Sequence, residues 1–195
     1  MSFVFLLSDS SAVTAVSALK SSLTQSQKNV ILVGLPGSGK TTVGRAAAKL
    51  LNWPFVDFDT EIERRAHASV AEIFERYGER HFRSLEQELS RELSRCNRTM
   101  MSAGGGWVTN TESVALLRQG GRIIYLRATP SLLIARLASA RVRRPLLEVP
   151  DPLGTLERLY TERRALYEQA DHVIDTEVVD RKELIEQVRQ YAASL

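Results

Sequence analysis

One stretch of eight residues, Gly34-Leu-Pro-Gly-Ser-Gly-Lys-Thr41, restricts the possible folds of this chain more than any other feature. It matches the pattern G-x-x-x-x-G-K-[ST], in which glycines let successive backbone N–H groups curl around phosphate oxygens. An apolar run, Val30–Val33, precedes it, and residues 39–51 have a helical pattern. Strand, glycine-rich loop and helix in this order place a phosphate at the helix N-terminus. The stretch therefore predicts a nucleotide-binding α/β fold rather than an ordinary glycine-rich turn.

Two side chains of this loop have defined chemical roles. Lys40 can reach the β- and γ-phosphates of a nucleotide, and the Thr41 hydroxyl suits Mg²⁺. The loop alone specifies no reaction, because GTPase switches, motor ATPases and small-molecule kinases share it. The Asn-Lys-x-Asp sequence expected of a GTPase is absent.

The rest of the chain alternates between strand and helix patterns. Further strands are predicted at residues 55–58, 99–102, 122–126 and 173–175. Between them, a short helix opens at the capping box Ser69–Glu72, and a longer helix has an apolar face over residues 82–93. Thr129-Pro130 and Asp180–Glu183 mark two further helix starts, and another helix runs to about residue 170. The pattern predicts a three-layer, doubly wound α/β fold around a five-stranded parallel sheet.

Length and composition favour one domain with an extension. The chain has 195 residues, of which residues 29–195 carry the alternating pattern. Residues 1–28 are rich in Ser, Ala and Thr, and we interpret them as an N-terminal extension of unknown role; a targeting peptide is the alternative. Residues 139–153 hold three arginines and three prolines without helical periodicity, which predicts a loop.

Composition also excludes several classes of protein. Apolar residues at 44% and charged residues at 25% exclude a disordered chain, and no apolar run approaches the roughly 20 residues that span a bilayer. The single cysteine, Cys96, excludes an intrachain disulfide and favours a reducing cytoplasm. A net charge of +3 is too small to indicate nucleic-acid binding. Because arginines outnumber lysines, small anionic ligands are favoured instead.

Several polar and glycine residues follow the predicted strands, where open α/β sheets bind ligands. Asp57 and Asp59 would face the same side if the extended geometry continued, and one could orient a magnesium-bound water while the other holds substrate hydroxyls. Alternatively, Asp59 is a helix N-cap. Gly104-Gly-Gly106 exposes backbone N–H groups to a ligand or forms a flexible turn. Arginines 83, 144 and 163 bind an anion or lie on the surface; for Arg83 the surface alternative is an ion pair or hydrogen bond to Glu86 or Gln87.

Together these residues resemble the shikimate kinases, which are phosphate-loop enzymes related to the nucleoside monophosphate kinases. The resemblance covers roughly residues 29–177. It rests on five ordered segments: Gly34–Thr42, Asp57–Glu63, Phe82-Arg83 with Glu86, Ser102–Gly106, and Arg144–Leu147 followed by Arg163 four positions before Tyr167.

The resemblance implies ATP-dependent phosphorylation of the shikimate 3-hydroxyl in aromatic amino-acid biosynthesis, by a cytoplasmic monomer with Mg²⁺ as cofactor. Lys40, Asp59 and Arg144 would be catalytic, and residues 139–153 would form a lid. The ATP-binding residues would be Gly37, Ser38, Gly39, Lys40, Thr41, Thr42 and Arg144. The metal residues would be Thr41 and Asp57, and the substrate-binding residues would be Asp59, Arg83, Gly104, Gly105, Gly106 and Arg163.

The chain departs from the family pattern at three points. Ala165 stands where the late arginine motif usually has proline, so either Arg163 or Arg164 could grip the substrate carboxylate. Leu137 occupies the spacing of the arginine that stacks on adenine, with Arg136 one step away. Trp107 is bulkier than the usual residue. A different small-molecule kinase, or a nucleotide-dependent switch without transfer activity, remains an alternative.

Overall fold

The computed structural model describes residues 28–138 and 149–195 and contains one parallel sheet. The strands run in the order β2-β3-β1-β4-β5, and every pair of neighbours is parallel. Their bounds are β1 Asn29–Val33, β2 Phe55–Asp57, β3 Met100–Ser102, β4 Gly121–Arg127 and β5 His172–Asp175. The predicted five-stranded parallel sheet is confirmed.

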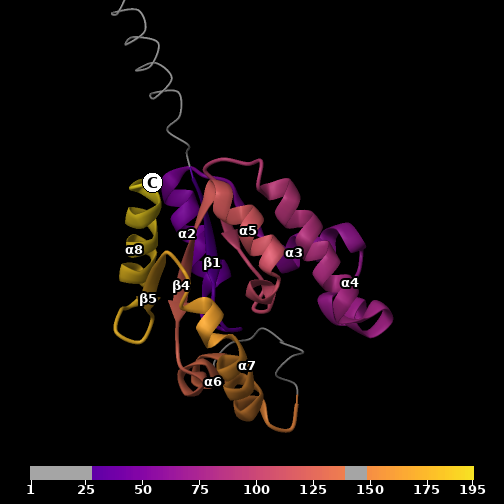
Figure 1. The fold of residues 1–195 in the computed structure, drawn as a ribbon. Helices are drawn as coiled ribbons and strands as arrows, with labels where there is room; N and C mark the ends of the chain where they lie inside the picture. Colours follow the sequence, from indigo (N-terminus) through magenta and orange to yellow (C-terminus); the bar gives the residue numbers. More distant parts are fainter. Residues whose placement is uncertain (1–27, 139–148) are drawn as a thin grey trace, which may run out of the picture.

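Helices connect the strands and cover both faces of the sheet (Figure 1). Their bounds are α2 Lys40–Leu51, α3 Phe58–Ala66, α4 Val70–Leu93, α5 Thr111–Gly120, α6 Pro130–Ala138, α7 Pro152–Tyr167 and α8 Arg181–Ala193, with a 3₁₀ turn η1 at Trp107–Thr109. None of these helices, within the described ranges, has the length and apolar character needed to cross a bilayer.

The central strand β1 shows why three layers form. Its side chains alternate between two cores: Val30 and Leu32 pack with α2 and α8, whereas Ile31 and Val33 pack with α3, α4, α5 and α7. All four are buried. A strand that is apolar on both faces needs a helical layer on each side, which is the arrangement typical of a parallel sheet.

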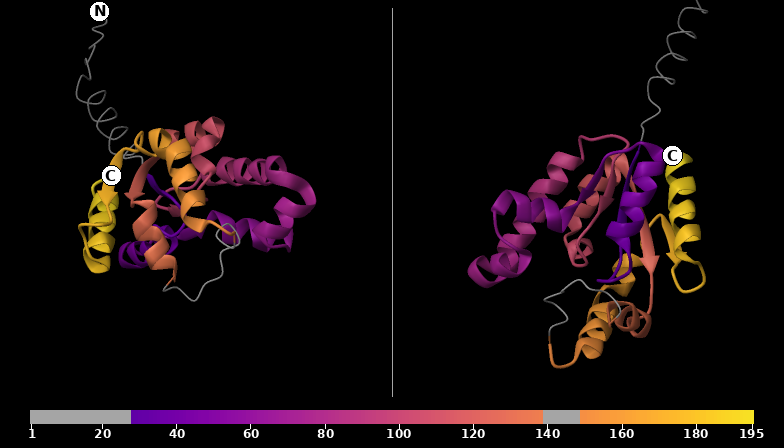
Figure 2. Two further views of the ribbon diagram at one scale, coloured as in Figure 1. Left: turned by 90° about the horizontal axis from the view of Figure 1, so that it is seen from below. Right: turned by 180° about the vertical axis from the view of Figure 1, so that it is seen from behind.

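The sheet topology fixes where a ligand can bind. Chain order reverses around β1, which lies between β3 and β4, and such switch points form the binding crevice in open α/β sheets. The phosphate-loop residues follow β1, and α6 and α7 lie beyond the carboxyl ends of the strands, in the lower part of Figure 1 and of the right view in Figure 2. The site must therefore be assembled at this end.

Two local predictions need correction, and two elements were not predicted. Helix α3 already begins at Phe58 with Asp57 as its N-cap, so Asp59 is not the cap and the extended geometry does not continue to it. The two helices expected after Ser69 are confirmed: the backbone of Gly78 is not helical (φ 79°, ψ 169°), so α4 consists of two helical segments, one on each side of Gly78. Helix α7 begins at Pro152, so the loop predicted to end at 153 ends earlier. Finally, η1 and α5 were not predicted. The remainder of the predicted lid, 139–148, lies outside the described residues.

Candidate active site

The loop after β1 has the backbone geometry that phosphate binding needs. Gly37 and Gly39 have positive φ angles of 89° and 94°, which other residues rarely adopt. At Gly34, a Cβ atom would lie 2.7 Å from the Leu126 carbonyl oxygen, so only glycine fits there. Ser38 is buried within the loop, whereas Thr42 is exposed on the first turn of α2. The loop thus presents backbone N–H groups at the N-terminus of α2.

Two side chains complete this phosphate-binding edge. Lys40 Nζ donates to the carbonyl oxygens of Gly34 and Leu35, at 2.8 and 2.9 Å, and so lies folded over the loop. The Thr41 hydroxyl donates to Asp57 Oδ2 at 2.7 Å and lies 3.4 Å from Ser102 Oγ. The second oxygen of Asp57 accepts hydrogen bonds from the backbone and side chain of Thr60.

The Thr41–Asp57 pair fits a magnesium ion. Mg²⁺ prefers hard oxygen ligands and is usually held by one or two side chains together with substrate phosphates and water. A hydroxyl and a carboxylate in contact beside the phosphate loop provide such donors. The described residues contain no group of three or more His, Cys, Asp or Glu side chains suited to hold a metal, so the remaining ligands would come from nucleotide and water.

Asp59 lies between the phosphate-binding edge and a second group of polar residues. Its side chain is accessible to solvent, but the surrounding protein atoms desolvate the carboxyl and raise its pKa, and the charge of Asp57 adds to the rise. The positive charges of Lys40 and Arg83 act in the opposite direction. A Cβ built on Gly104 would lie 3.0 Å from Asp59 Oδ1, so glycine leaves room for this carboxylate.

Arg83 is held by two carboxylates of its own helix. Its Nη1 atom lies 2.6 Å from Glu86 Oε2, and its Nη2 atom lies 2.7 Å from Glu79 Oε1. A Cβ atom on Gly106 would collide with the guanidinium, which therefore packs directly on the glycine backbone. The expected pair with Glu86 is present, but it is not a solvated surface pair, since the Glu86 side chain is fully buried.

Glu86 is the residue of this site whose role the sequence pattern did not predict. Burial raises its pKa to about 7 against the lowering effect of Arg83. Its Oε1 atom is buried without a hydrogen-bond partner among the described residues, and it would lie 2.8 Å from a Cβ on Gly104. Helical spacing from Arg83 reveals the contact with Glu86, and equally the one with Glu79, but not the burial.

The two neighbouring arginines of α7, Arg163 and Arg164, lie in different surroundings. A Cβ built on Gly105 would lie 3.7 Å from Arg163 Nη1, so Arg163 reaches the glycine loop. Arg164 is exposed, lies 3.9 Å from Glu168 and packs over the Tyr160 ring. Of the two candidates for the carboxylate, the structure therefore brings Arg163 to the site and leaves Arg164 on the outer surface of α7.

Other residues of the sequence prediction lie around this site. Arg136 donates to the side chain and backbone of Thr176, and Leu137 packs against Gly37 of the phosphate loop. The Trp107 ring is fully buried in the core and donates to Ser90 Oγ, so its bulk is accommodated there. Arg144 lies outside the described residues.

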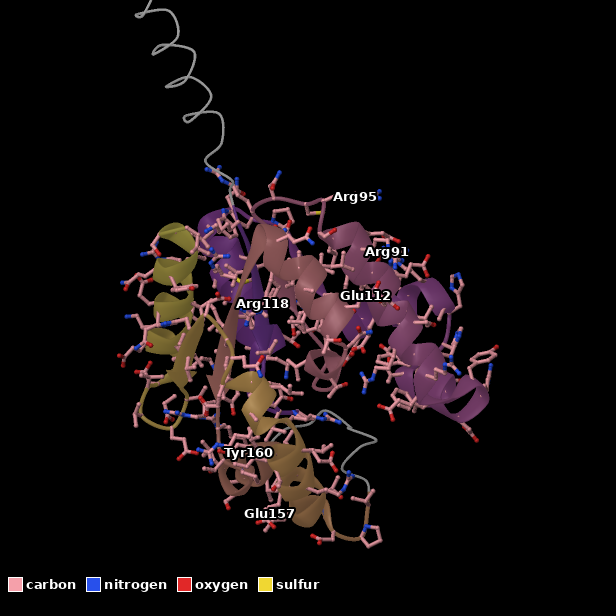
Figure 3. All side chains as sticks on the ribbon, in the orientation of Figure 1. Arg91, Arg95, Glu112, Arg118, Glu157 and Tyr160 are labelled. Carbon is pink, nitrogen blue, oxygen red and sulfur yellow. The ribbon has the colours of Figure 1, made fainter. Side chains whose placement is uncertain are left out.

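Further charged side chains lie on outer helix surfaces, among them Arg91 of α4 and Glu112 of α5, 3.7 Å apart (Figure 3). They form no part of the group around Asp59.

Comparison with known proteins identifies the family of this chain. The family model described as shikimate kinase matches residues 36–193. Shikimate kinase of Caldanaerobacter subterraneus is 40% identical over 161 residues, which is 83% of this chain and 94% of that protein. Shikimate kinase of Burkholderia thailandensis is 45% identical over 149 residues, covering 76% of this chain and 80% of its own.

Solved structures give the same result. Shikimate kinase from Acinetobacter baumannii in complex with shikimate superposes with a TM-score of 0.79 at 35% identity, covering 89% of this chain and 97% of that one. A gluconokinase from Sinorhizobium meliloti superposes at 0.57 with 15% identity, covering 86% and 93%, and that likeness concerns the fold alone. The matched family model spans most of the chain, from the phosphate loop to α8, and on that ground the chain belongs to the shikimate kinase family.

Proposed function

We propose that this protein transfers the γ-phosphoryl group of ATP to the 3-hydroxyl of shikimate, giving shikimate 3-phosphate and ADP on the route to aromatic amino acids. The observation that carries the proposal is the grouping of Asp59, Arg83 and Arg163 around Gly104–Gly106, next to the phosphate loop. These three residues come from three helices, α3, α4 and α7. A carboxylate and two guanidinium groups match a ligand with hydroxyls and one carboxylate.

The transfer itself needs positioning and charge neutralisation more than covalent chemistry. A new bond forms between the 3-oxygen and the γ-phosphorus. The bond from that phosphorus to the β–γ bridging oxygen breaks, and this oxygen leaves as part of ADP. Asp59 orients the hydroxyl and accepts its proton, and its raised pKa makes it a better base than an ordinary aspartate. Lys40, already over the phosphate loop, stabilises the negative charge of the transferred group.

The substrate carboxylate is assigned to Arg83 and Arg163. A guanidinium binds a carboxylate through two parallel hydrogen bonds, which fixes direction as well as charge. Because Glu79 and Glu86 hold Arg83 from two sides, little side-chain entropy remains to be lost on binding. Arg144 is proposed to bind the phosphates of ATP and to take part in catalysis.

Thr41 and Asp57 would hold Mg²⁺, which when bound neutralises phosphate charge. We assign the reaction to a monomer in the cytoplasm; the single cysteine supports the reducing compartment.

The decisive test is ADP release from ATP alone and with each of three acceptors: shikimate, gluconate and deoxyadenosine. We expect stimulation by shikimate only. Arg83→Ala is expected to raise the KM for shikimate at least tenfold, because it removes a charge-assisted contact to the carboxylate. Arg76→Ala is the control, since Arg76 forms an exposed ion pair with Glu72 on the segment of α4 that precedes Gly78. Stimulation by gluconate or deoxyadenosine instead of shikimate would refute the substrate assignment.

A further inference from the structure

Two tyrosines are stacked in the core beneath the glycine loop and differ in one respect. Tyr125 of β4 and Tyr167 of α7 have ring centroids 5.0 Å apart, with planes inclined by 17°. Both residues are fully buried. The Tyr125 hydroxyl has no hydrogen-bond partner among the described residues, whereas the Tyr167 hydroxyl donates to the Gly105 carbonyl oxygen at 2.5 Å. The rings share an environment, but only one hydroxyl is connected to the site.

The Tyr167 bond joins two parts of the substrate site that are far apart in sequence. Gly105 is the middle glycine of the loop, 62 positions from Tyr167. Its Cα lies between Pro36 of the phosphate loop and the Arg163 guanidinium, since a Cβ there would be 3.2 Å from Pro36 Cδ and 3.7 Å from Arg163 Nη1. Arg163 lies one helical turn before Tyr167 on α7, so both side chains reach the glycine loop from one helix face.

Arg163 also acts on the tyrosine hydroxyl directly. Burial raises the pKa of Tyr167 to about 12, and the nearby Arg163 guanidinium opposes that rise. The hydroxyl therefore keeps its proton at neutral pH and remains a donor to Gly105. The hydroxyl and the Arg163 guanidinium thus both lie at Gly105, one through a hydrogen bond and the other through close approach.

We propose that the Tyr167 hydroxyl is a positioning group for substrate binding: it fixes the Arg163 guanidinium and the Gly105 backbone relative to one another, so that they meet the substrate together. The inference rests on the proposed function, because the substrate carboxylate is the ligand assigned to Arg163. Tyr167 does not touch the substrate in this scheme; it acts through Arg163 and Gly105.

The test compares two substitutions that each remove one hydroxyl and keep the ring. In Tyr167→Phe, the Gly105 backbone loses its hydrogen bond to α7 and is no longer held beside Arg163. We therefore expect the KM for shikimate to rise about tenfold, while kcat changes less than threefold and the KM for ATP is unchanged. Tyr125→Phe removes a hydroxyl that has no partner among the described residues, and it should leave all three constants at wild-type values and the Tm equal to or above that of the wild type. Circular dichroism and Tm establish that both variants are folded.

A double-mutant cycle separates positioning from a general loss of packing. If Tyr167 acts through Arg163, then Tyr167→Phe adds less than twofold to the KM of Arg163→Lys, because the positioned group is already changed. A wild-type KM in Tyr167→Phe, or effects of the two substitutions that multiply, would overturn the inference. A wild-type protein without shikimate-dependent ADP release would instead overturn the proposed function, so the two failures are distinguishable.

Discussion

The phosphate-binding edge and the substrate-binding side of the site are built on different principles. At the phosphate edge, backbone geometry does most of the work: glycines with positive φ shape the loop, and Lys40, Thr41 and Asp57 already have hydrogen-bond partners. Each region also has one buried oxygen without a hydrogen-bond partner among the described residues: Ser38 Oγ in the phosphate loop and Glu86 Oε1 on the substrate side. The two oxygens differ in their chemistry: the Ser38 hydroxyl is neutral, whereas Glu86 is an ionisable carboxyl whose burial raises its pKa.

This difference has a physical origin. A phosphate loop is continuous in sequence, so strand β1 and helix α2 fix its shape by themselves. The substrate side draws side chains from α3, α4, α7 and the turn after β3, and its geometry depends on how these elements pack. Substitutions at the phosphate edge should therefore reduce turnover, while those on the substrate side should mainly change substrate affinity.

The largest effect is expected for Lys40→Ala. Losing a fixed electrostatic contact to the transferred group costs about 10²–10³ in kcat. Steady-state kinetics with saturating ATP and shikimate measure it, and Lys49→Ala, on the exposed last turn of α2, is the control. A kcat within threefold of the wild-type value would contradict the proposal that the phosphate edge determines turnover.

The next effect is expected for Arg83→Lys. Lysine keeps the charge but lacks the planar fork, so we expect the KM for shikimate to rise roughly ten- to fiftyfold with a smaller change in kcat. The measurement is the KM for each substrate under identical conditions. An unchanged KM for shikimate together with a raised KM for ATP would assign Arg83 to the phosphate-binding edge instead of the substrate-binding side.

The phosphate edge could be predicted from the sequence more fully than the substrate side. The phosphate loop, the five strands and the capping box of α4 follow from local patterns, and all are found as predicted. The register at the end of β2 was wrong, because Asp57 caps α3 and Asp59 lies on the helix. The sequence analysis considered Asp59 as the N-cap, two residues after the N-cap of α3 in the structure. Burial of Glu86 depends on the packing of α4 against the rest of the domain, which no spacing within α4 reveals.

A moderate effect is expected for Gly104→Ala. The new methyl group would lie 2.8 Å from Glu86 Oε1 and 3.0 Å from Asp59 Oδ1, so at least one carboxylate must move. We expect a several-fold rise in the KM for shikimate. Gly120→Ala is the matched control, since the nearest atom to its methyl group would be 3.7 Å away and alanine favours the helix. Equal kinetics in the two variants would show that the space at Gly104 does not matter.

The last prediction concerns stability and its pH dependence, with no expected change in turnover. The pKa of Glu86 is raised from an ordinary value to about 7, so the folded state binds its proton more tightly than the unfolded chain. Its contribution to stability is therefore fully present below about pH 4.5 and is lost as the pH rises through 7. Glu86→Gln removes this dependence, and between pH 5 and 8 the variant should gain on the order of 3 kcal/mol relative to wild type.

Urea unfolding followed by tryptophan fluorescence across this range checks the prediction. Glu88→Gln, an exposed position on the same helix, controls for the change in net charge. If the free energies of unfolding of the wild type and of Glu86→Gln have parallel pH profiles, then folding does not raise the pKa of Glu86.

The most direct test of the account is to compare shikimate with its methyl ester as acceptors for the unmodified protein. The ester keeps every ring hydroxyl and removes only the negative charge that Arg83 and Arg163 are proposed to bind. We predict that kcat/KM for the ester falls at least tenfold below that for shikimate, mostly through KM. Equal kcat/KM values for acid and ester would contradict the claim that this site recognises a carboxylate.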